Sequence, residues 1–134
     1  MGRTIRAAFA AIALMASPAS AGGLDGAWRI VEISGVDDGV DHAGAEFILL
    51  ENGRAAMSLG CNRMSATPRI DGERIAFGPV IGTRRGCPPP LGEAEAAFIE
   101  ALRAARMFRI DETDRRAQLL DETDAARVTL ERAD

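Results

Sequence analysis

The sequence contains no lysine and no tyrosine, and it has only one tryptophan, one histidine and two cysteines. All 16 basic residues are arginine, and 20 acidic residues outnumber them, giving a formal net charge of −4. An acidic chain with few aromatic residues lacks the basic surface that neutralises phosphates, so no nucleic-acid partner is expected. One histidine and two cysteines supply too few nitrogen and sulfur ligands for a tetrahedral zinc site, and no cofactor is expected. The 134 residues suffice for one domain.

Residues 1–21 have the features of a secretory signal peptide. Arg3 and Arg6 precede an apolar run over residues 7–16, and residues 19–21 (ASA) fit a signal-peptidase cleavage site. The run would form a helix of about 15 Å, roughly half of a hydrocarbon core of ~30 Å, which is too short for an anchor. We therefore expect cleavage after Ala21 and export to the periplasm or the medium, with no transmembrane segment left.

After residue 21, short apolar segments alternate with turn residues, which is typical of antiparallel strands. Two dipeptides, Asn52-Gly53 and Asp71-Gly72, predict tight hairpins, the first because both residues tolerate positive φ. Pro68 predicts an edge or a bulge within its strand. The expected strands are 28–33, 46–50, 55–59, 65–70, 74–77, 107–110, 117–120 and 126–130.

One segment changes from the strand period to the helix period. Ala94, Phe98, Ala101, Leu102 and Ala105 share one face of a helix, which we expect over residues 92–106. The prolines at 88–90 mark its start, because proline does not fit the interior of a helix. The predicted fold is mainly β (α+β): a small antiparallel, barrel-like meander with one amphipathic helix that covers one end or face of the sheet.

Three groups of polar residues are candidates for functional sites. The tetrapeptide DETD occurs at 111–114 and at 121–124, and its carboxylates could suit calcium, but successive turns of a meander lie at opposite ends of a strand. We expect solvated turns and no metal. His42 could serve as an acid or base beside Asp37, Asp38 and Asp41, but no nucleophile motif accompanies it. The pairs Arg84-Arg85 and Arg115-Arg116 are expected on a solvated face.

Cys61 and Cys87 are 26 residues apart, far from the spacing of a redox or zinc motif. An exported chain meets an oxidising compartment, where an even pair of cysteines normally forms a disulfide. We expect that bridge, with two free buried thiols as the alternative.

The order of these motifs resembles the META domain, the family of HslJ-like bacterial envelope proteins. The resemblance begins at Leu24-x-Gly26-x-Trp28 and is clearest at Gly60-Cys61-Asn62-Arg63. It continues through Thr83-x-x-x-Cys87, Glu95-x-x-Phe98-x-x-x-Leu102 and Val128-x-Leu130. It spans nearly all of residues 22–134, which we take as the domain.

The resemblance implies a compact, mostly antiparallel barrel-like domain, a role in tolerance of envelope stress such as heat and antibiotics, and no catalytic activity. Trp28, Gly60, Asn62 and Thr83 are expected to be structural: Asn62 bonding nearby backbone and Gly60 permitting a close approach. We expect a monomer that contacts unidentified envelope proteins. Two alternatives stay open: a small-molecule carrier, because small barrels can enclose a ligand, and a hydrolase that uses His42.

Overall fold

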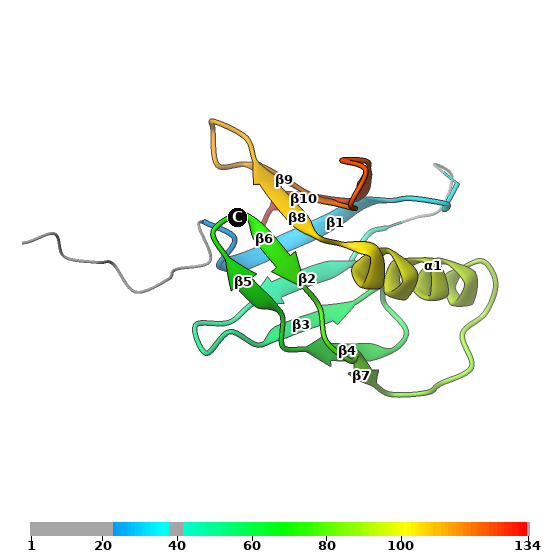
Figure 1. The fold of residues 1–134 in the computed structure, drawn as a ribbon. Coiled ribbons are helices and arrows are strands. Elements are labelled where there is room, and N and C mark those ends of the chain that lie inside the picture. Colours follow the sequence, from blue (N-terminus) through cyan, green and yellow to red (C-terminus); the bar gives the residue numbers. More distant parts are fainter. Residues whose placement is uncertain (1–22, 38–41, 134) are drawn as a thin grey trace, which may run out of the picture.

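Ten antiparallel strands and one helix make up the computed structural model, which describes residues 23–37 and 42–133 (Figure 1). The expected signal peptide, residues 1–21, lies outside the described residues. The elements are β1 (Gly26–Ile33), β2 (Glu46–Leu49), β3 (Ala55–Ser58), β4 (Arg63–Ala66), β5 (Arg69–Asp71), β6 (Arg74–Ala76), β7 (Ile81–Gly82), α1 (Leu91–Ala104), β8 (Met107–Ile110), β9 (Arg116–Leu120) and β10 (Ala126–Arg132).

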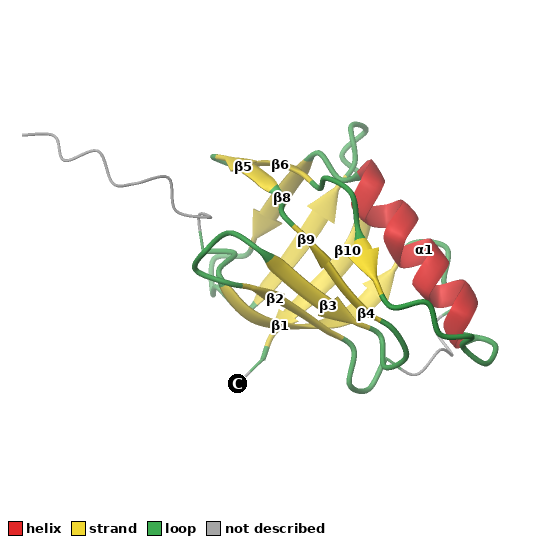
Figure 2. Cartoon of the chain, turned by 90° about the horizontal axis from the view of Figure 1, so that it is seen from below, coloured by secondary structure: helices red, strands yellow, loops and turns green. Residues whose placement is uncertain are grey.

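All ten strands belong to one sheet, in the order β5-β6-β8-β9-β10-β1-β2-β3-β4-β7. The first and last strands in sequence, β1 and β10, are neighbours in its middle. The sheet curls into a half-barrel, and α1 lies along one of its sides (Figure 2). The predicted fold class, mainly β with one helix, is therefore confirmed.

Alternate side chains of the strands fill the inner side of the curled sheet. In β2, for example, Phe47 and Leu49 are buried, whereas Glu46 is exposed. The helix contributes Ala94, Phe98, Ala101 and Leu102, and it packs against β1 and β10. These side chains form one contiguous hydrophobic cluster with the buried residues of the sheet. Burying apolar surface on both elements at once is the main stabilising contribution to such a fold.

The strand expected over residues 65–70 is divided in two, which corrects the prediction. β4 ends at Ala66 and β5 begins at Arg69, and these two strands lie far apart in the sheet order. Pro68 between them has no N–H to donate to a ladder, so the pairing stops there. The chain crosses from one end of the sheet to the other over two residues, which is possible because the sheet curls.

The boundaries of other elements also differ from the predictions. The helix ends at Ala104 because Ala105 is extended, and Arg106 N donates instead to Leu120 O at 2.8 Å. β7 was not predicted, because a strand of two residues has no readable periodicity. The β2–β3 hairpin forms at Asn52-Gly53 as predicted, but of the two residues only Gly53 has a positive φ, of 85°.

The two DETD segments form hairpin turns, as expected. They connect β8 to β9 and β9 to β10, at opposite ends of β9. In each turn the N–H of the fourth residue donates to the carbonyl of the first, over 3.0 Å in one turn and 3.1 Å in the other. The fourth residues, Asp114 and Asp124, have positive φ values of 59° and 63°. Aspartate tolerates this conformation better than most residues, which suits it to such turns.

Candidate functional site

Cys61 and Cys87 form a disulfide, as the prediction requires, with their Cα atoms 6.1 Å apart. Cys61 lies in the connection between β3 and β4, and Cys87 lies in the segment that leads to α1. The bridge therefore joins the sheet to the entrance of the helix. By the loop-entropy relation, a bridge with a separation of 26 residues contributes about 3.5 kcal/mol to stability.

The side chain of Asn62, next to Cys61, is buried and forms the centre of a polar cluster. Its Oδ1 accepts two hydrogen bonds of 2.8 Å, one from Oγ1 of Thr83 and one from the backbone N–H of Arg85. A buried amide costs free energy unless its polar atoms are bonded, and here both lone pairs of the oxygen have donors.

The nitrogen of the same amide faces the helix. Nδ2 of Asn62 donates to Oε1 of Glu95 at 2.6 Å and to the carbonyl of Arg85 at 3.2 Å. The backbone N–H of Asn62 donates to Oε2 of Glu95 at 3.3 Å. Asn62 thus joins three parts of the chain: the β3–β4 connection, the segment before α1, and α1 itself. No local pattern indicates the pairing of Glu95 with Asn62, because the two residues are 33 positions apart in the chain.

Thr83 and two glycines complete the surroundings of the cluster. Oγ1 of Thr83 accepts from the N–H of Arg63 at 3.1 Å, which continues the pairing of β4 and β7. Gly60 has a φ of +105°, but a Cβ there would meet no atom within 4 Å, so the close approach expected at Gly60 was wrong. The close approach occurs at Gly82, where a Cβ would lie 2.7 Å from the carbonyl oxygen of Arg63.

The cluster has the composition of a metal site but not its chemistry. Ligand atoms of Cys61, Cys87 and Glu95 lie within 4.8 Å of one another. Metal ions bind thiolates, however, and both sulfur atoms are held in the disulfide. The oxidised cluster therefore offers one carboxylate, and that carboxylate accepts two hydrogen bonds from Asn62.

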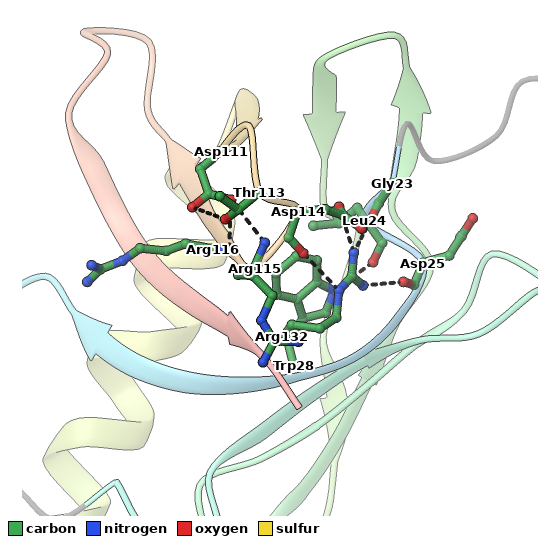
Figure 3. A network of polar contacts seen from close by, with 10 residues as sticks. All are labelled: Gly23, Leu24, Asp25, Trp28, Asp111, Thr113, Asp114, Arg115, Arg116 and Arg132. Atoms are coloured by element: carbon green, nitrogen blue, oxygen red, sulfur yellow. Dashed lines mark hydrogen bonds and ion pairs between the residues drawn. The ribbon is translucent and has the colours of Figure 1, made fainter. Parts of the chain in front are cut away.

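Trp28 belongs to a different group of contacts (Figure 3). Its side chain is fully buried, and its Nε1 donates to the carbonyl of Leu24 at 2.9 Å. The guanidinium carbon of Arg132 lies 3.8 Å from the centre of its rings, within the range of a cation–π contact. The sequence predicted Trp28 as structural but gave no signal for Arg132, which pairs with Trp28 across β1 and β10.

Arg132 also holds the N-terminal segment of the domain. Its guanidinium donates to the carbonyls of Gly23 and Asp25, both at 2.7 Å, and to Oδ1 of Asp114 at 2.9 Å. The residues before β1 are thereby fixed against the β8–β9 turn and the last strand. Arginine suits this position because its planar group has five donors, which reach several acceptors at once.

The first aspartate of each DETD turn accepts hydrogen bonds from its own turn. The backbone N–H of Arg116 lowers the pKa of Asp111 below its usual value of 3.8, with help from Arg115 and Thr113. The side chain and the backbone N–H of Thr123 lower the pKa of Asp121 in the same direction. These two carboxylates therefore accept hydrogen bonds within their own turns.

His42 does not belong to the polar cluster around Asn62. It lines a cleft of about 290 Å³ with Glu32, Asp37 and three apolar residues. None of the described residues that line this cleft is a serine, threonine or cysteine. The geometry that a hydrolase based on His42 requires, a nucleophile within reach of the imidazole, is not found among them.

The comparisons with known proteins concern the whole domain. The META domain profile matches residues 22–134. An NMR structure of a protein from Burkholderia xenovorans is 23% identical, with a TM-score of 0.65 over 87% of this chain and 88% of that chain. A crystal structure of a DUF4847 family protein from Bacteroides vulgatus is 17% identical, with a TM-score of 0.55 over 81% of this chain and 92% of that chain. The search of curated proteins found no match.

These similarities extend over most of the chain, and the two solved structures share its fold. In the described part of the chain, no helix has both the length and the apolar character needed to cross a membrane. The profile match includes both cysteines, Asn62, Thr83 and Trp28. The chain belongs to the META domain family.

Proposed function

We propose that this protein is a non-enzymatic META-domain scaffold that acts outside the cytoplasm and supports tolerance of the cell envelope to heat and antibiotics through contacts with other proteins. The observation that carries the proposal is that the polar atoms of the buried Asn62 side chain all have hydrogen-bond partners within the domain. The oxygen and the nitrogen of its buried amide are bonded to Thr83, Arg85 and Glu95. Groups that are bonded within the fold in this way stabilise it and are not free to bind a substrate.

The disulfide supports the extracytoplasmic part of the proposal. Disulfides persist in oxidising compartments and are rare in the reducing cytosol. Cys61 and Cys87 are joined, and the described residues contain no free cysteine. The leader expected over residues 1–21 provides a route of export.

The packing of the domain favours a scaffold over a carrier of small molecules. A carrier needs an enclosed cavity, whereas the inner side of the curled sheet is filled by a contiguous cluster of buried side chains. Trp28, Phe47 and Phe98, the largest of them, are completely buried within it. The interior is therefore the hydrophobic core of the domain, and contacts with partners would use the outer surface.

Complementation tests the proposal. A strain that lacks the gene is supplied with the full chain, or with residues 22–134 alone, which stay in the cytoplasm. We expect only the exported chain to restore survival under heat and antibiotic stress. The mass of the recovered protein should correspond to cleavage after Ala21. Equal rescue by the cytoplasmic form would contradict the proposal.

The absence of catalysis is tested in the same strain. The variant His42→Ala, supplied to this strain, is expected to restore tolerance as fully as the wild-type protein does. If the variant is present at normal levels but does not restore tolerance, the hydrolase hypothesis is favoured. Crosslinking in stressed, intact cells is expected to capture envelope proteins. Recovery of a copurifying lipid or metabolite, with no captured protein, would favour the carrier.

A further inference from the structure

β7 is the last strand in the sheet order, so only one of its sides is paired. Ile81 faces Ser65 and Gly82 faces Met64, while Thr83 N donates to Arg63 O at 3.1 Å. Bonded groups alternate along an antiparallel pair, and the N–H and C=O groups of Gly82 therefore point away from β4. Within the described sheet, no further strand lies on that side to bond them.

A row of uncharged side chains crosses the outer face of the sheet and ends at this edge. Ala27, Ile48, Ala56, Ser65 and Ile81 are successive cross-strand partners on β1, β2, β3, β4 and β7. Ile81 ends the row and is 71% exposed, more than any other large hydrophobic residue of the described chain. The solvated face of an antiparallel sheet is normally polar, so an uncharged row that ends at an unpaired edge indicates a contact surface.

Positive charge flanks the exposed isoleucine on both sides. Ile81 borders a cleft of about 440 Å³ that is also lined by Arg84, and another of about 380 Å³ that is also lined by Arg54. Glu95 is the acidic residue lining the larger cleft, and its carboxylate is bonded to Asn62. On a chain with a net charge of −4, this local excess of arginine favours a partner of opposite charge.

We propose that β7 accepts an extended, acidic segment of a partner protein as an added strand. The inference rests on the proposed function and names the surface through which the protein contacts occur. The segment bonds to the outward backbone groups of Gly82 and packs an apolar side chain against Ile81. Its carboxylates pair with Arg54 and Arg84. Such added strands gain affinity from main-chain bonds and specificity from alternate side chains.

A second copy of this chain is a poorer occupant of the same edge. Pairing of two β7 edges would bring together two surfaces that each carry Arg54 and Arg84 beside Ile81. Like charges on neighbouring strands are destabilising. The short strand, with Pro79 before it and arginines after it, is thus protected against self-association and remains accessible to an acidic segment.

Peptide selection on the purified domain, with its disulfide formed, tests the inference. The probe is a phage-displayed library of random dodecapeptides. We expect the enriched peptides to alternate apolar residues with aspartate or glutamate. In NMR spectra, a selected peptide should shift the amide signals of residues 80–83. Failure of any peptide to enrich, enrichment of basic peptides, or shifts confined to other surfaces would overturn the inference.

Matched variants test which residues contribute to the affinity for the selected peptide. Ile81→Glu and Arg84→Glu are expected to weaken binding of the selected peptide by roughly tenfold or more. The control is Arg109→Glu on β8, which makes the same change of charge on a strand far from β7 in the sheet order. This control should bind within about twofold of the wild type. Equal effects of the test and control variants would overturn the assignment to β7.

The two proposals fail in different ways. If envelope proteins are captured in cells but no peptide binds at β7, the docking surface is wrong and the proposed function stands. If the cytoplasmic form restores stress tolerance, the proposed function is wrong, whether or not a selected peptide binds at β7.

Discussion

Asn62 and Glu95 are joined by two hydrogen bonds, of 2.6 Å and 3.3 Å, although 33 residues separate them in the sequence. The amide is buried and the carboxylate lies near the start of α1, so the contact fixes the helix against the β3–β4 connection. The disulfide between Cys61 and Cys87 joins the same two regions covalently. The domain thus uses a covalent link and a polar link at one place.

Asn62→Ala should destabilise the fold substantially. The substitution removes the hydrogen-bond partners of Thr83 Oγ1, of Arg85 N and of one oxygen of Glu95. These contacts are partly buried, so water replaces the lost partners only incompletely. Leaving such groups without partners should cost about 2–4 kcal/mol in the free energy of unfolding. Urea denaturation measures it. The control is Asn52→Ala in an exposed turn, where Oδ1 accepts one bond of 3.0 Å and the loss should stay below about 1 kcal/mol. Equal losses at the two asparagines would show that the cluster contributes little.

Removal of the disulfide should lower stability without changing the fold. The double variant Cys61→Ala/Cys87→Ala should lose about 3.5 kcal/mol of unfolding free energy, because the unfolded chain regains the freedom of the closed loop. Thermal denaturation of both proteins under non-reducing conditions provides the comparison. Thiol titration of the unfolded, unreduced wild type should find no reactive thiol, and two reactive thiols would contradict the bridge.

Arg132→Ala should loosen the surroundings of the single tryptophan. The variant loses the cation–π contact with Trp28 and the bonds to the carbonyls of Gly23 and Asp25. We expect a loss of about 1–3 kcal/mol and a shift of tryptophan emission to longer wavelength as water reaches the rings. Arg29→Ala is the control, because its ion pair with Glu131 is exposed, and its effect should stay within about 0.5 kcal/mol. Unchanged emission in Arg132→Ala would contradict the proposed role of the guanidinium.

The stability of the domain should fall in acid partly through its two DETD turns. Asp111 and Asp121 have a lower pKa in the folded chain than the usual 3.8, so the unfolded chain takes up their protons first as the pH falls. Their stabilising contribution is present above about pH 4 and is lost as the pH falls through the depressed pKa values. The double variant Asp111→Asn/Asp121→Asn has no proton to take up at these positions. Its melting temperature should therefore decrease less than that of the wild type between about pH 4.5 and pH 2.5.

Glutamates of the same turns provide the control for this experiment. Glu112→Gln/Glu122→Gln removes the same number of charges from the same two turns and should keep the pH slope of the wild type. A slope that flattens equally in both double variants would show that net charge, and not the hydrogen bonds of the aspartates, causes the acid sensitivity.

Local patterns in the sequence predicted much of the fold. The apolar face of the helix, the prolines before it and the two DETD turns are each defined by residues close together in the chain, and each forms near the expected place. The pairing of the cysteines also followed from the sequence, because a chain with two cysteines allows one intramolecular bridge and the predicted leader favours an oxidising compartment. Trp28 and Asn62 could be singled out through the family resemblance, without their partners.

The tertiary structure decided which distant residues meet. The order of the strands places Arg132 over Trp28, and the curl of the sheet brings Asn62 to Glu95. The need for glycine at position 82, and the exposed edge beside Ile81, depend on how β7 pairs with β4. Periodicity and turn chemistry depend on neighbours a few residues away, whereas these contacts join segments that only the complete packing of the sheet and helix brings together.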